Sequence, residues 1–396
     1  MEFDFRWAVL LCALFFALGW MAARIDIKQL VTESRALPRT YFRGLNFLLN
    51  EQPDKAIEAF IEVVKVDPQT VELHFALGNL FRRRGEVERA IRMHQNLVDR
   101  DDLAPDQRVH AIFELGQDFL KAGLLDRSEQ CFLKLKGTSF EPQAREMLLE
   151  IYEKEKDWGK AIEVAQARAG QNDQTDLRQV AQFHCELAQQ DMTHSRFDEA
   201  RAHLVEALAA NRKCARANLL LGDLEANAGN PQAAVAAWKL IEGQDPRYLA
   251  LIAQRLLAAF KQLGQGDAGV ALLKGYLTAY PSLDLFNAVY QPVLDTEGAA
   301  RAQEFVREEL KRNPTLMGLD KFLESQLLEA PLERRRDLEM IRALMHQHTR
   351  GLSLYRCDTC GFKARQYYWH CPACGGWETY PPRRMEEREL MGQAGG

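Results

Sequence analysis

The sequence predicts an all-α fold in which a superhelical solenoid of paired helices follows a transmembrane helix and ends in a small metal-binding knuckle. Apolar residues recur at spacings of three and four through most of the 396 residues, and no convincing run alternates like a strand. This pattern itself recurs with a period near 34 residues. Four of the eight cysteines lie in one short segment near the carboxy terminus. The first two features predict repeated helix pairs, and the third predicts a metal site.

The composition is that of a folded protein, with 47% hydrophobic and 27% charged residues. The formal net charge of −5 argues against nucleic acid as a partner, because phosphate-binding domains usually carry a strong basic excess. Outside the cluster, Cys12, Cys131, Cys185 and Cys214 are scattered singly, unlike the cysteines of a disulfide framework. This distribution predicts a reducing compartment and one metal site.

The transmembrane helix is predicted from residues 7–23, WAVLLCALFFALGWMAA, which contain no charge and no proline. At about 1.5 Å per residue, this stretch is near the short limit for a membrane span. Trp7 and Trp20 lie near its two ends, where interfacial indoles are favoured. We expect residues 1–24 to form an anchor and residues 25–40 to form a juxtamembrane linker.

A cleaved signal peptide is the alternative interpretation of this stretch. Its amino-terminal region would be only weakly basic, because Glu2 and Asp4 offset Arg6. Small residues permit a cleavage site, but Trp20 would follow that site awkwardly. A retained anchor is therefore favoured.

The orientation of the anchor follows from the flanking basic residues. Only Arg6 precedes the apolar stretch, whereas four basic residues follow it: Arg24, Lys28, Arg35 and Arg39. The positive-inside rule then places the long carboxy-terminal part in the cytoplasm. This agrees with the reducing compartment predicted from the cysteines.

Residues 41–351 are predicted to form about eight or nine helix pairs of the tetratricopeptide repeat (TPR) type, whose pattern is W-x2-L-G-x2-Y, then A-x3-F, then P. The first two units are related by 34 positions, from Gly44 to Gly78. The matching residues in successive units are Gly44, Phe47, Ala56, Phe60 and Pro68; Leu77, Gly78, Phe81 and Ala90; Leu115, Gly116, Phe119 and Phe132; Tyr152, Trp158 and Ala161; Leu187, Ala188, Phe197 and Ala200; and Leu221, Gly222, Ala234, Trp238 and Pro246. Two or three degenerate units continue through Tyr290, Ala302 and Pro314.

Packing explains the residue types of the repeat. Glycine and alanine let two helices approach closely, and an aromatic side chain fills the adjacent hole. No single unit can bury its apolar face alone, so neighbouring units stack into a superhelix. Such a superhelix has a long concave surface that commonly binds segments of other proteins, although the pattern does not identify a partner.

Two arginine runs, residues 82–84 and 334–336, are expected on solvated helix faces, with contact to an acidic partner or anionic lipid as the alternative. His184, His194 and His203 are expected to be isolated surface or core residues rather than metal ligands.

Residues 264–269, GQGDAG, match the dinucleotide-binding pattern G-x-G-x-x-G. A dinucleotide site needs a strand before this motif, but the preceding LIAQRLLAAFKQL has a helical pattern. We therefore expect a turn between helices here. The sequence contains no P-loop, no H-E-x-x-H pair and no other catalytic constellation, so we expect that the protein is not an enzyme.

The most specific segment is YRCDTCGFKARQYYWHCPACGGW, in which Cys357-x2-Cys360 and Cys371-x2-Cys374 are separated by ten residues. Each Cys-x2-Cys turn presents two thiolates, and four thiolates complete one tetrahedral site for zinc or iron. We expect residues 352–382 to form a metal-binding domain and residues 383–396 to form a tail. His370 lies beside the third cysteine and is expected to support the site without ligating the metal.

These knuckles resemble those of rubredoxin in Tyr355-x-Cys357-x2-Cys360-Gly361 and Cys371-Pro372-x-Cys374-Gly375. The gap between them is far shorter than in rubredoxin, which argues against independent electron transfer. A structural metal, which folds a segment too small for its own core, is the favoured interpretation. Because almost no linker separates this segment from the last repeat, we expect it to pack on the final TPR helices through Tyr367, Tyr368, Trp369 and Trp377.

The amino-terminal span, the TPR units and the terminal knuckle together resemble the lipopolysaccharide assembly protein B family of Gram-negative bacteria. The most specific part of the resemblance is YRCDTCGF…YYWHCPACGGW, with Y-W-H before the third cysteine. The resemblance implies that Cys357, Cys360, Cys371 and Cys374 hold one metal ion. It also implies the membrane anchor and the repeat array.

The resemblance further implies an adaptor at the cell inner membrane, with a single span and most of the chain in the cytoplasm. Such an adaptor would regulate lipid A synthesis by bringing the committing deacetylase to a membrane ATP-dependent protease, which degrades it. The implied partners are that protease, the lipid A deacetylase, other inner-membrane lipopolysaccharide regulators and the membrane itself, and a homo-oligomer is left open. Two alternatives remain from the residues: a redox protein with a rubredoxin-like iron centre, and a secreted TPR assembly factor.

Overall fold

The computed structural model describes residues 39–50, 52–66, 71–168, 174–349 and 351–387, together with Phe16 and Trp20. The predicted anchor, apart from these two residues, and most of the predicted linker lie outside the described residues. Among the residues that are described, no helix is both long enough and apolar enough to cross a membrane.

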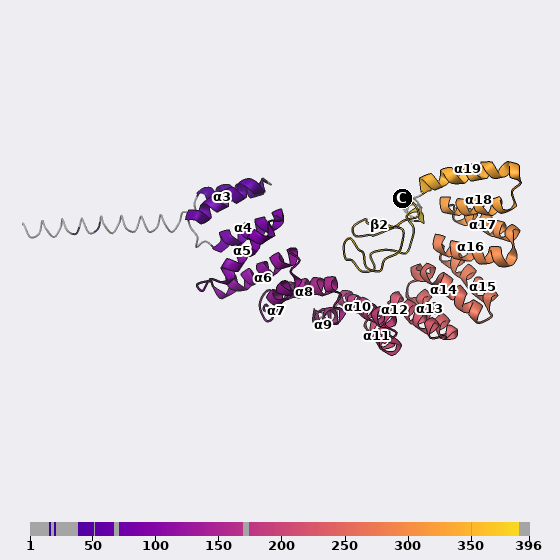
Figure 1. The fold of residues 1–396 in the computed structure, drawn as a ribbon, viewed down its shortest axis with the longest axis horizontal. Helices are drawn as coiled ribbons and strands as arrows, with labels where there is room; N and C mark the ends of the chain where they lie inside the picture. The colour runs from indigo at the N-terminus through magenta and orange to yellow at the C-terminus, as the bar shows by residue number, and fades with distance from the viewer. Residues whose placement is uncertain are drawn as a thin grey trace, which may run out of the picture. The chain divides into compact units, whose positions relative to one another are not determined.

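The described part of the chain is mostly helical and divides into two compact units, Met1–Ile151 and Tyr152–Gly396. The first unit contains α2 (Arg39–Leu49), α3 (Pro53–Val66), α4 (Val71–Arg84), α5 (Val87–Val98), α6 (Pro105–Lys121), α7 (Leu125–Leu133) and most of α8 (Glu141–Glu155). The second contains the end of α8 and then α9 (Trp158–Arg168), α10 (Gln174–Thr193), α11 (Phe197–Ala210), α12 (Ala215–Asn227), α13 (Pro231–Gln244), η1 (Pro246–Tyr248), α14 (Leu249–Gln262), α15 (Gly266–Ala279), α16 (Leu283–Glu297), α17 (Ala299–Arg312), α18 (Leu316–Glu329) and α19 (Leu332–Thr349). Consecutive helices pack as pairs within each unit, as the TPR pattern predicts (Figure 1).

Contacts between a small residue and a large ring hold the helices of a pair together. A Cβ atom added to Gly222 on α12 would lie 2.2 Å from Nε1 of Trp238 on α13, so only glycine allows this approach. The Trp238 indole N–H also donates a hydrogen bond to the carbonyl of Leu219, at 3.1 Å. Equivalent contacts join Gly44 to Phe60, Gly78 to His94 and Gly116 to Phe132. These contacts confirm the packing role predicted for the repeat residues.

The glycine motif at residues 264–269 is a turn between two helices. Gly264 has a φ of 71°, in the left-handed region that glycine adopts without strain, and it lies between α14 and α15. Because a helix precedes the motif, it lacks the strand that a dinucleotide site requires. The prediction of a turn is confirmed.

The sequence-based expectation for one arginine was wrong. Arg82 is not on a solvated face: its side chain is largely buried and pairs with Glu114 and Asp118, at 2.5 and 2.8 Å. His184 and His203, which are far apart along the sequence, are neighbours in the fold, since their Nδ1 atoms lie 3.3 Å apart. Helix packing brings together residues that are distant in the sequence, which the period alone could not show. The remaining arginines of both runs, residues 83–84 and 334–336, are exposed as expected.

Two of the scattered cysteines also meet in the folded chain. The Sγ atoms of Cys185 on α10 and Cys214, which directly precedes α12, lie 3.9 Å apart. Both side chains are fully buried. They form a packed thiol pair in the core of the second unit, rather than two separate residues.

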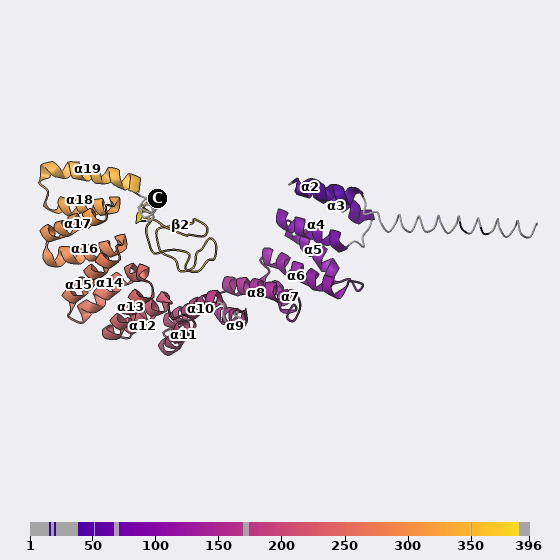
Figure 2. The ribbon, with the colours of Figure 1, turned by 180° about the vertical axis from the view of Figure 1, so that it is seen from behind.

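The second unit ends in a small module that lies inside the arc formed by its helices (Figures 1 and 2). The module contains the short antiparallel strands β1 (Tyr355–Arg356) and β2 (Lys363–Ala364), with Arg356 opposite Lys363. Tyr367 and Trp369 of the module pack against the large apolar core that runs through α10 to α17. The array and the module therefore share one core in this unit.

Candidate metal centre

The module is built from two Cys-x2-Cys loops with the same backbone geometry. In the first loop, the N–H of Gly361 donates to the carbonyl of Cys357 at 3.0 Å, and the N–H of Cys357 donates to the carbonyl of Phe362 at 2.9 Å. The same two bonds recur fourteen positions later, both at 2.9 Å, among Cys371, Gly375 and Gly376. Gly361 and Gly375 have φ values of 76° and 68°, which explains why glycine follows each loop.

The backbone pairing beside each loop repeats as well. Arg356 pairs with Lys363 in the two-stranded sheet, and fourteen positions later His370 forms an antiparallel bridge to Trp377. In each loop the first cysteine is buried and the second is exposed. The module is thus a pair of matched half-sites that face each other.

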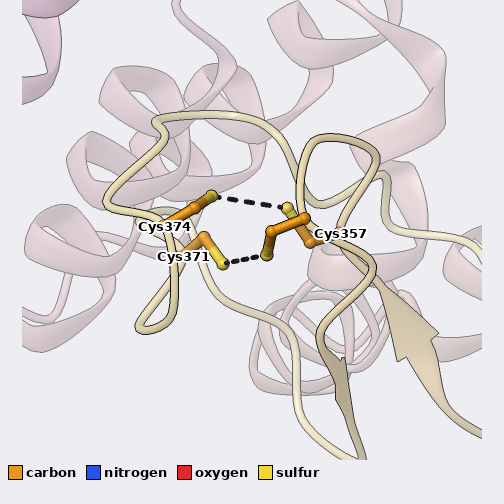
Figure 3. Close-up of side chains that lie close together, drawn as sticks. Cys357, Cys371 and Cys374 are labelled. Carbon is orange, nitrogen blue, oxygen red and sulfur yellow. Dashed lines mark hydrogen bonds between the residues drawn. The ribbon is translucent and has the colours of Figure 1, made fainter. Parts of the chain in front are cut away.

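The four predicted cysteines come together at one point. Their Sγ atoms all lie within 4.8 Å of one another, and Figure 3 shows Cys357, Cys371 and Cys374 pointing toward a shared centre. The Sγ atoms of Cys357 and Cys374 are 3.8 Å apart, and those of Cys360 and Cys371 are 3.7 Å apart. A tetrahedral ion with metal–sulfur bonds of about 2.3 Å has sulfur–sulfur edges of about 3.8 Å. The arrangement fits one tetrahedral metal ion, and zinc and iron both suit four thiolates.

Hydrogen bonds at Cys357 favour its thiolate form. Burial raises the pKa of Cys357, but its hydrogen bond with the Thr379 hydroxyl and those from the backbone N–H groups of Cys360 and Thr359 outweigh burial and lower its pKa to about 6. Metal ligation requires the deprotonated sulfur. The loop backbone therefore prepares this residue to bind a metal.

His370 supports the loops and does not point at the sulfur atoms. Its Nε2 lies 2.9 Å from the carbonyl of Gly375, and its ring stacks on Trp377 with centroids 4.3 Å apart. These contacts join the two ends of the second loop, in agreement with a supporting role.

Trp377 fixes the module to the helices that begin the second unit. Its ring meets Trp158 on α9 and Phe183 on α10 edge to face, with centroids 6.0 and 5.8 Å apart. Its indole N–H donates to Glu153 Oε1 at 3.3 Å. The next residue, Glu378, adopts a left-handed φ of 53° and accepts a hydrogen bond from Gln182 Nε2 at 2.9 Å.

A buried arginine on α12 lies between two indoles of the module. The Arg216 guanidinium is 5.8 Å from the ring centroids of both Trp369 and Trp377, within the range of cation–π attraction. It also donates to Glu186 Oε1 at 2.7 Å, so the buried charge is compensated. Trp369 stacks on Tyr248 of η1, with centroids 4.8 Å apart.

The prediction that the module packs only on the final TPR helices therefore included too few helices. The module contacts α9, α10, α12 and η1 as well as later helices. Tyr367, Trp369 and Trp377 make apolar contacts with the array as expected, whereas Tyr368 packs inside the module against Tyr380. A repeat array curves, so its middle helices come within reach of a segment that follows its last helix.

Residues just beyond the predicted metal-binding domain complete the attachment. Arg384 pairs with Asp284 of α16 at 2.9 Å, and the Tyr355 hydroxyl donates to the same carboxylate at 2.6 Å. Leu283 is the first residue of α16, and its N–H donates a hydrogen bond to Glu387 at 3.0 Å. Glu386 accepts hydrogen bonds from N–H groups in the first turn of α18, including that of Met317 at 3.1 Å. Two carboxylates therefore cap two helix N-termini, where negative charge is stabilising.

Little in the sequence pointed to these attachment residues. Arg216 and Asp284 resemble ordinary polar positions of a helix, and Glu386 lies in a charged run that was expected to be a tail. One feature of the sequence did indicate a large contact surface. Aromatic residues are unusually dense between the two Cys-x2-Cys loops, and there are more of them than so small a module can bury by itself.

Comparison with known proteins identifies both the repeats and the metal module. Residues 355–382 match the family model "Rubredoxin metal binding domain", and residues 43–105 and 185–248 match "Tetratricopeptide repeat". The chain is 35% identical over 371 residues to lipopolysaccharide assembly protein B of Escherichia coli strain K12, covering 93% of this chain and 95% of that protein. The chain belongs to the lipopolysaccharide assembly protein B family.

A second member of the lipopolysaccharide assembly protein B family shows the same extent of similarity. The protein of that name from Haemophilus influenzae is 31% identical over 388 residues, covering 94% of this chain and 96% of that protein. Among solved structures, "Structure of Naa15/Naa10 bound to HypK-THB" is 16% identical, with a TM-score of 0.40, and covers 85% of this chain and 56% of that one.

Proposed function

We propose that this protein is a non-enzymatic adaptor of lipopolysaccharide assembly, which regulates lipid A synthesis by bringing the committing deacetylase to a membrane ATP-dependent protease. The observation that carries the proposal is the similarity to two proteins named for lipopolysaccharide assembly, which extends over more than nine tenths of the chain. Degradation of the deacetylase is the finer part of the proposal and rests on the resemblance to the family.

The architecture of the described residues supports an adaptor. A repeat array offers an extended surface for binding protein segments. In the second unit, the metal module is fixed to that array by rings, a buried arginine and carboxylate caps rather than by a flexible linker. We assign the metal a structural role, because about thirty residues are too few to fold on their own apolar core.

Depletion of the protein in its native host tests the adaptor function. We expect the deacetylase to become longer-lived and more abundant, because its delivery to the protease would fail. Its half-life is measured by immunoblotting after protein synthesis is stopped, with an unrelated substrate of the same protease as the control. An unchanged half-life of the deacetylase would refute the adaptor function.

We further propose a single membrane span before residue 25, with the array and the module in the cytoplasm. The basic residues that follow the apolar stretch support this orientation. A reporter that is active only in the periplasm, fused after Gly396, should be silent. A matched cytoplasmic reporter should be active, and the reverse result would contradict the orientation.

A redox role is the second candidate, because Cys360 and Cys374 are exposed and place two ligand sulfurs at the surface. An iron centre there would be open to electron exchange. Metal analysis and the visible spectrum of the purified protein separate the candidates: colourless zinc protein supports the structural role, whereas a reversible one-electron colour change supports the redox role.

A further inference from the structure

A large polar cleft lies in the second unit where the module meets the array. Its volume is about 830 Å³. It is lined by the first turns of α10, by the segments that precede α12 and α14, and by Trp377 and Glu378 of the module. None of the metal ligands lines this cleft. It is therefore distinct from the metal centre, and its walls come from both the array and the module.

The cleft is electropositive although the whole chain carries a net charge of −5. Arg178, Arg212 and Lys213 line it, and all three are exposed and form no ion pair with any described residue. A fourth cation, Arg247, is neutralised by Asp245 at 2.6 Å. Among the described residues that line the cleft, these three cations thus face a single remaining carboxylate, that of Glu378. Walls of one charge sign concentrate an oppositely charged ligand.

Two glutamine side chains that line the cleft have a buried acceptor atom without a donor among the described residues. Gln179 Oε1 and Gln244 Oε1 are buried, and neither has a hydrogen-bond partner among the described residues. The orientation of Gln244 is fixed, because its Nε2 donates to the carbonyl of Arg212 at 2.7 Å. A buried acceptor without a partner is costly, which indicates that a ligand with N–H or O–H groups supplies the missing bonds.

We propose that this cleft binds an acidic peptide segment of a partner protein. Carboxylate side chains of the segment pair with Arg178, Arg212 and Lys213, and its backbone N–H groups donate to Gln179 and Gln244. A peptide is the ligand that supplies both features at once, because its backbone N–H groups recur beside each acidic side chain. The inference builds on the proposed adaptor function, since it identifies a docking site and the chemistry of the segment that docks.

A direct binding measurement tests the site. The probe is a fluorescein-labelled, amidated peptide of alternating alanine and glutamate, titrated with the full chain in detergent and followed by fluorescence anisotropy. We expect binding that weakens as the NaCl concentration rises, since the cations are exposed. Substituting Arg212→Gln and Lys213→Gln together should weaken binding about tenfold, as expected for the loss of two close charge pairs.

A matched variant separates the site from general charge. Arg334→Gln with Arg336→Gln removes the same charge from exposed positions of α19 and should leave the affinity within about twofold, because isolated surface charges contribute little. An equal loss of peptide affinity in both double variants would overturn the proposal, and so would equal binding of a peptide with glutamine in place of glutamate. Full displacement of the peptide by inorganic phosphate or by a sugar phosphate would assign the cleft to a small phosphorylated ligand instead and would also overturn it.

The test is independent of the deacetylase assay. If depletion leaves the deacetylase half-life unchanged while the cleft binds the acidic peptide specifically, the adaptor function is refuted and the proposal for the cleft is supported. If the cleft variant binds the peptide normally while depletion stabilises the deacetylase, the adaptor function is supported and the proposal for the cleft is refuted.

Discussion

At the scale of single residues, the closest packing in the array depends on the absence of a side chain. Gly222 lets the Trp238 ring lie against the backbone of α12, and a Cβ atom would clash with Nε1 of that ring. The ring is almost completely buried, so it has little room to move. The indole also donates to the Leu219 carbonyl, and displacement would break that bond.

Gly222→Ala should therefore destabilise the second unit by about 1–3 kcal/mol, the usual cost of overpacking a core. Thermal unfolding followed by circular dichroism measures this loss. Gly243 on α13 is the matched control, because a Cβ atom there meets nothing within 4 Å. Gly243→Ala should be neutral or stabilise by up to about 1 kcal/mol, since alanine favours the helix. Equal destabilisation by both substitutions would show that helix propensity, and not the ring contact, decides the outcome.

A buried network of charges is the second feature at this scale, and it lies in the first unit. Asp118 is fully buried and pairs with Arg82 and with Nδ1 of His94, at 2.8 and 2.5 Å. Glu114 pairs with the same arginine and contacts His110 at 3.3 Å. Burial raises the pKa of Glu114, but the bonds to His110 and Arg82 outweigh burial and hold it at about 2.

This lowered pKa predicts how the stability of the first unit depends on pH. A carboxylate with a folded pKa below its unfolded value stabilises the fold above the unfolded pKa, near 4.5, and that contribution is lost as the pH falls toward 2. Glu114→Gln should lower the unfolding temperature at pH 6, and the difference from the unsubstituted protein should shrink between about pH 4.5 and pH 2.

The exposed Glu88 on α5 provides the control for this prediction. Glu88→Gln should change the unfolding temperature little at any pH, because exposed charges contribute little. A difference for Glu114→Gln that stays constant down to pH 2 would show that its charge does not stabilise the unit.

At the scale of elements, two helices of the array, α16 and α18, receive N-terminal capping bonds from Glu387 and Glu386. The residue before α16 is Ser282, whose hydroxyl makes no capping bond and is buried without a partner among the described residues. Glu387 accepts from the first N–H of that helix instead. The N-terminus of α16 is thus capped by a carboxylate that lies about one hundred residues further along the chain.

Removing these caps should loosen the attachment without unfolding the array. Glu386→Ala with Glu387→Ala should cost about 2 kcal/mol, at roughly 1 kcal/mol for each lost cap. Hydrogen exchange should quicken at the amides of Leu283 and Met317 and throughout the module. Glutamine at both positions should restore part of the protection, because its carbonyl oxygen still accepts. No change in exchange at these amides would rule out the capping role.

The sequence predicted the elements more completely than their attachment. Recurring small and aromatic residues, such as Gly222 and Trp238, predicted the helix pairs, because their spacing reflects contacts within one pair or with the next. The bonds of Glu387 and Arg216 join residues far apart in the chain and follow no period. Their positions depend on how far the array curves, which results from small rotations summed over many units.

At the scale of the molecule, the metal centre and the array of the second unit are interdependent. All four predicted cysteines meet at one site, because the two Cys-x2-Cys spacings determine the local geometry. The broad surface that the module covers was not predicted, since nothing in the Cys-x2-Cys pattern specifies what lies outside the loops. We therefore expect a bound metal to stabilise part of the array as well as the roughly thirty residues that hold it.

Replacing Cys357 and Cys360 by serine should release the metal and unfold the module. Because the module covers rings on α9, α10 and η1, those helices should exchange amide hydrogens faster and become sensitive to protease. Helices α2 to α7 should remain protected, since the units of a solenoid depend mainly on their neighbours. Metal analysis, hydrogen exchange and limited proteolysis are measured on the same variant.

Cys131→Ala is the control for that variant, because this cysteine is buried in α7, away from the metal ligands in the sequence. It should retain the full metal content. Normal exchange in α9 and α10 of the metal-free double variant would show that the array does not need the module.

The contact between Trp377 and Glu153 spans 224 residues, and this separation has a consequence for biosynthesis. A growing chain emerges from the ribosome from its amino terminus, and most repeat units can fold as soon as their neighbours appear. The rings of Trp158, Phe183 and Tyr248 cannot be covered at that stage, because Trp369 and Trp377, which cover them, lie more than a hundred residues further along the chain. We therefore expect the nascent protein to expose these apolar rings until the module emerges and binds its metal, and exposed apolar surface of this kind is what chaperones recognise. A shortage of metal should then delay a late step in the folding of each new molecule.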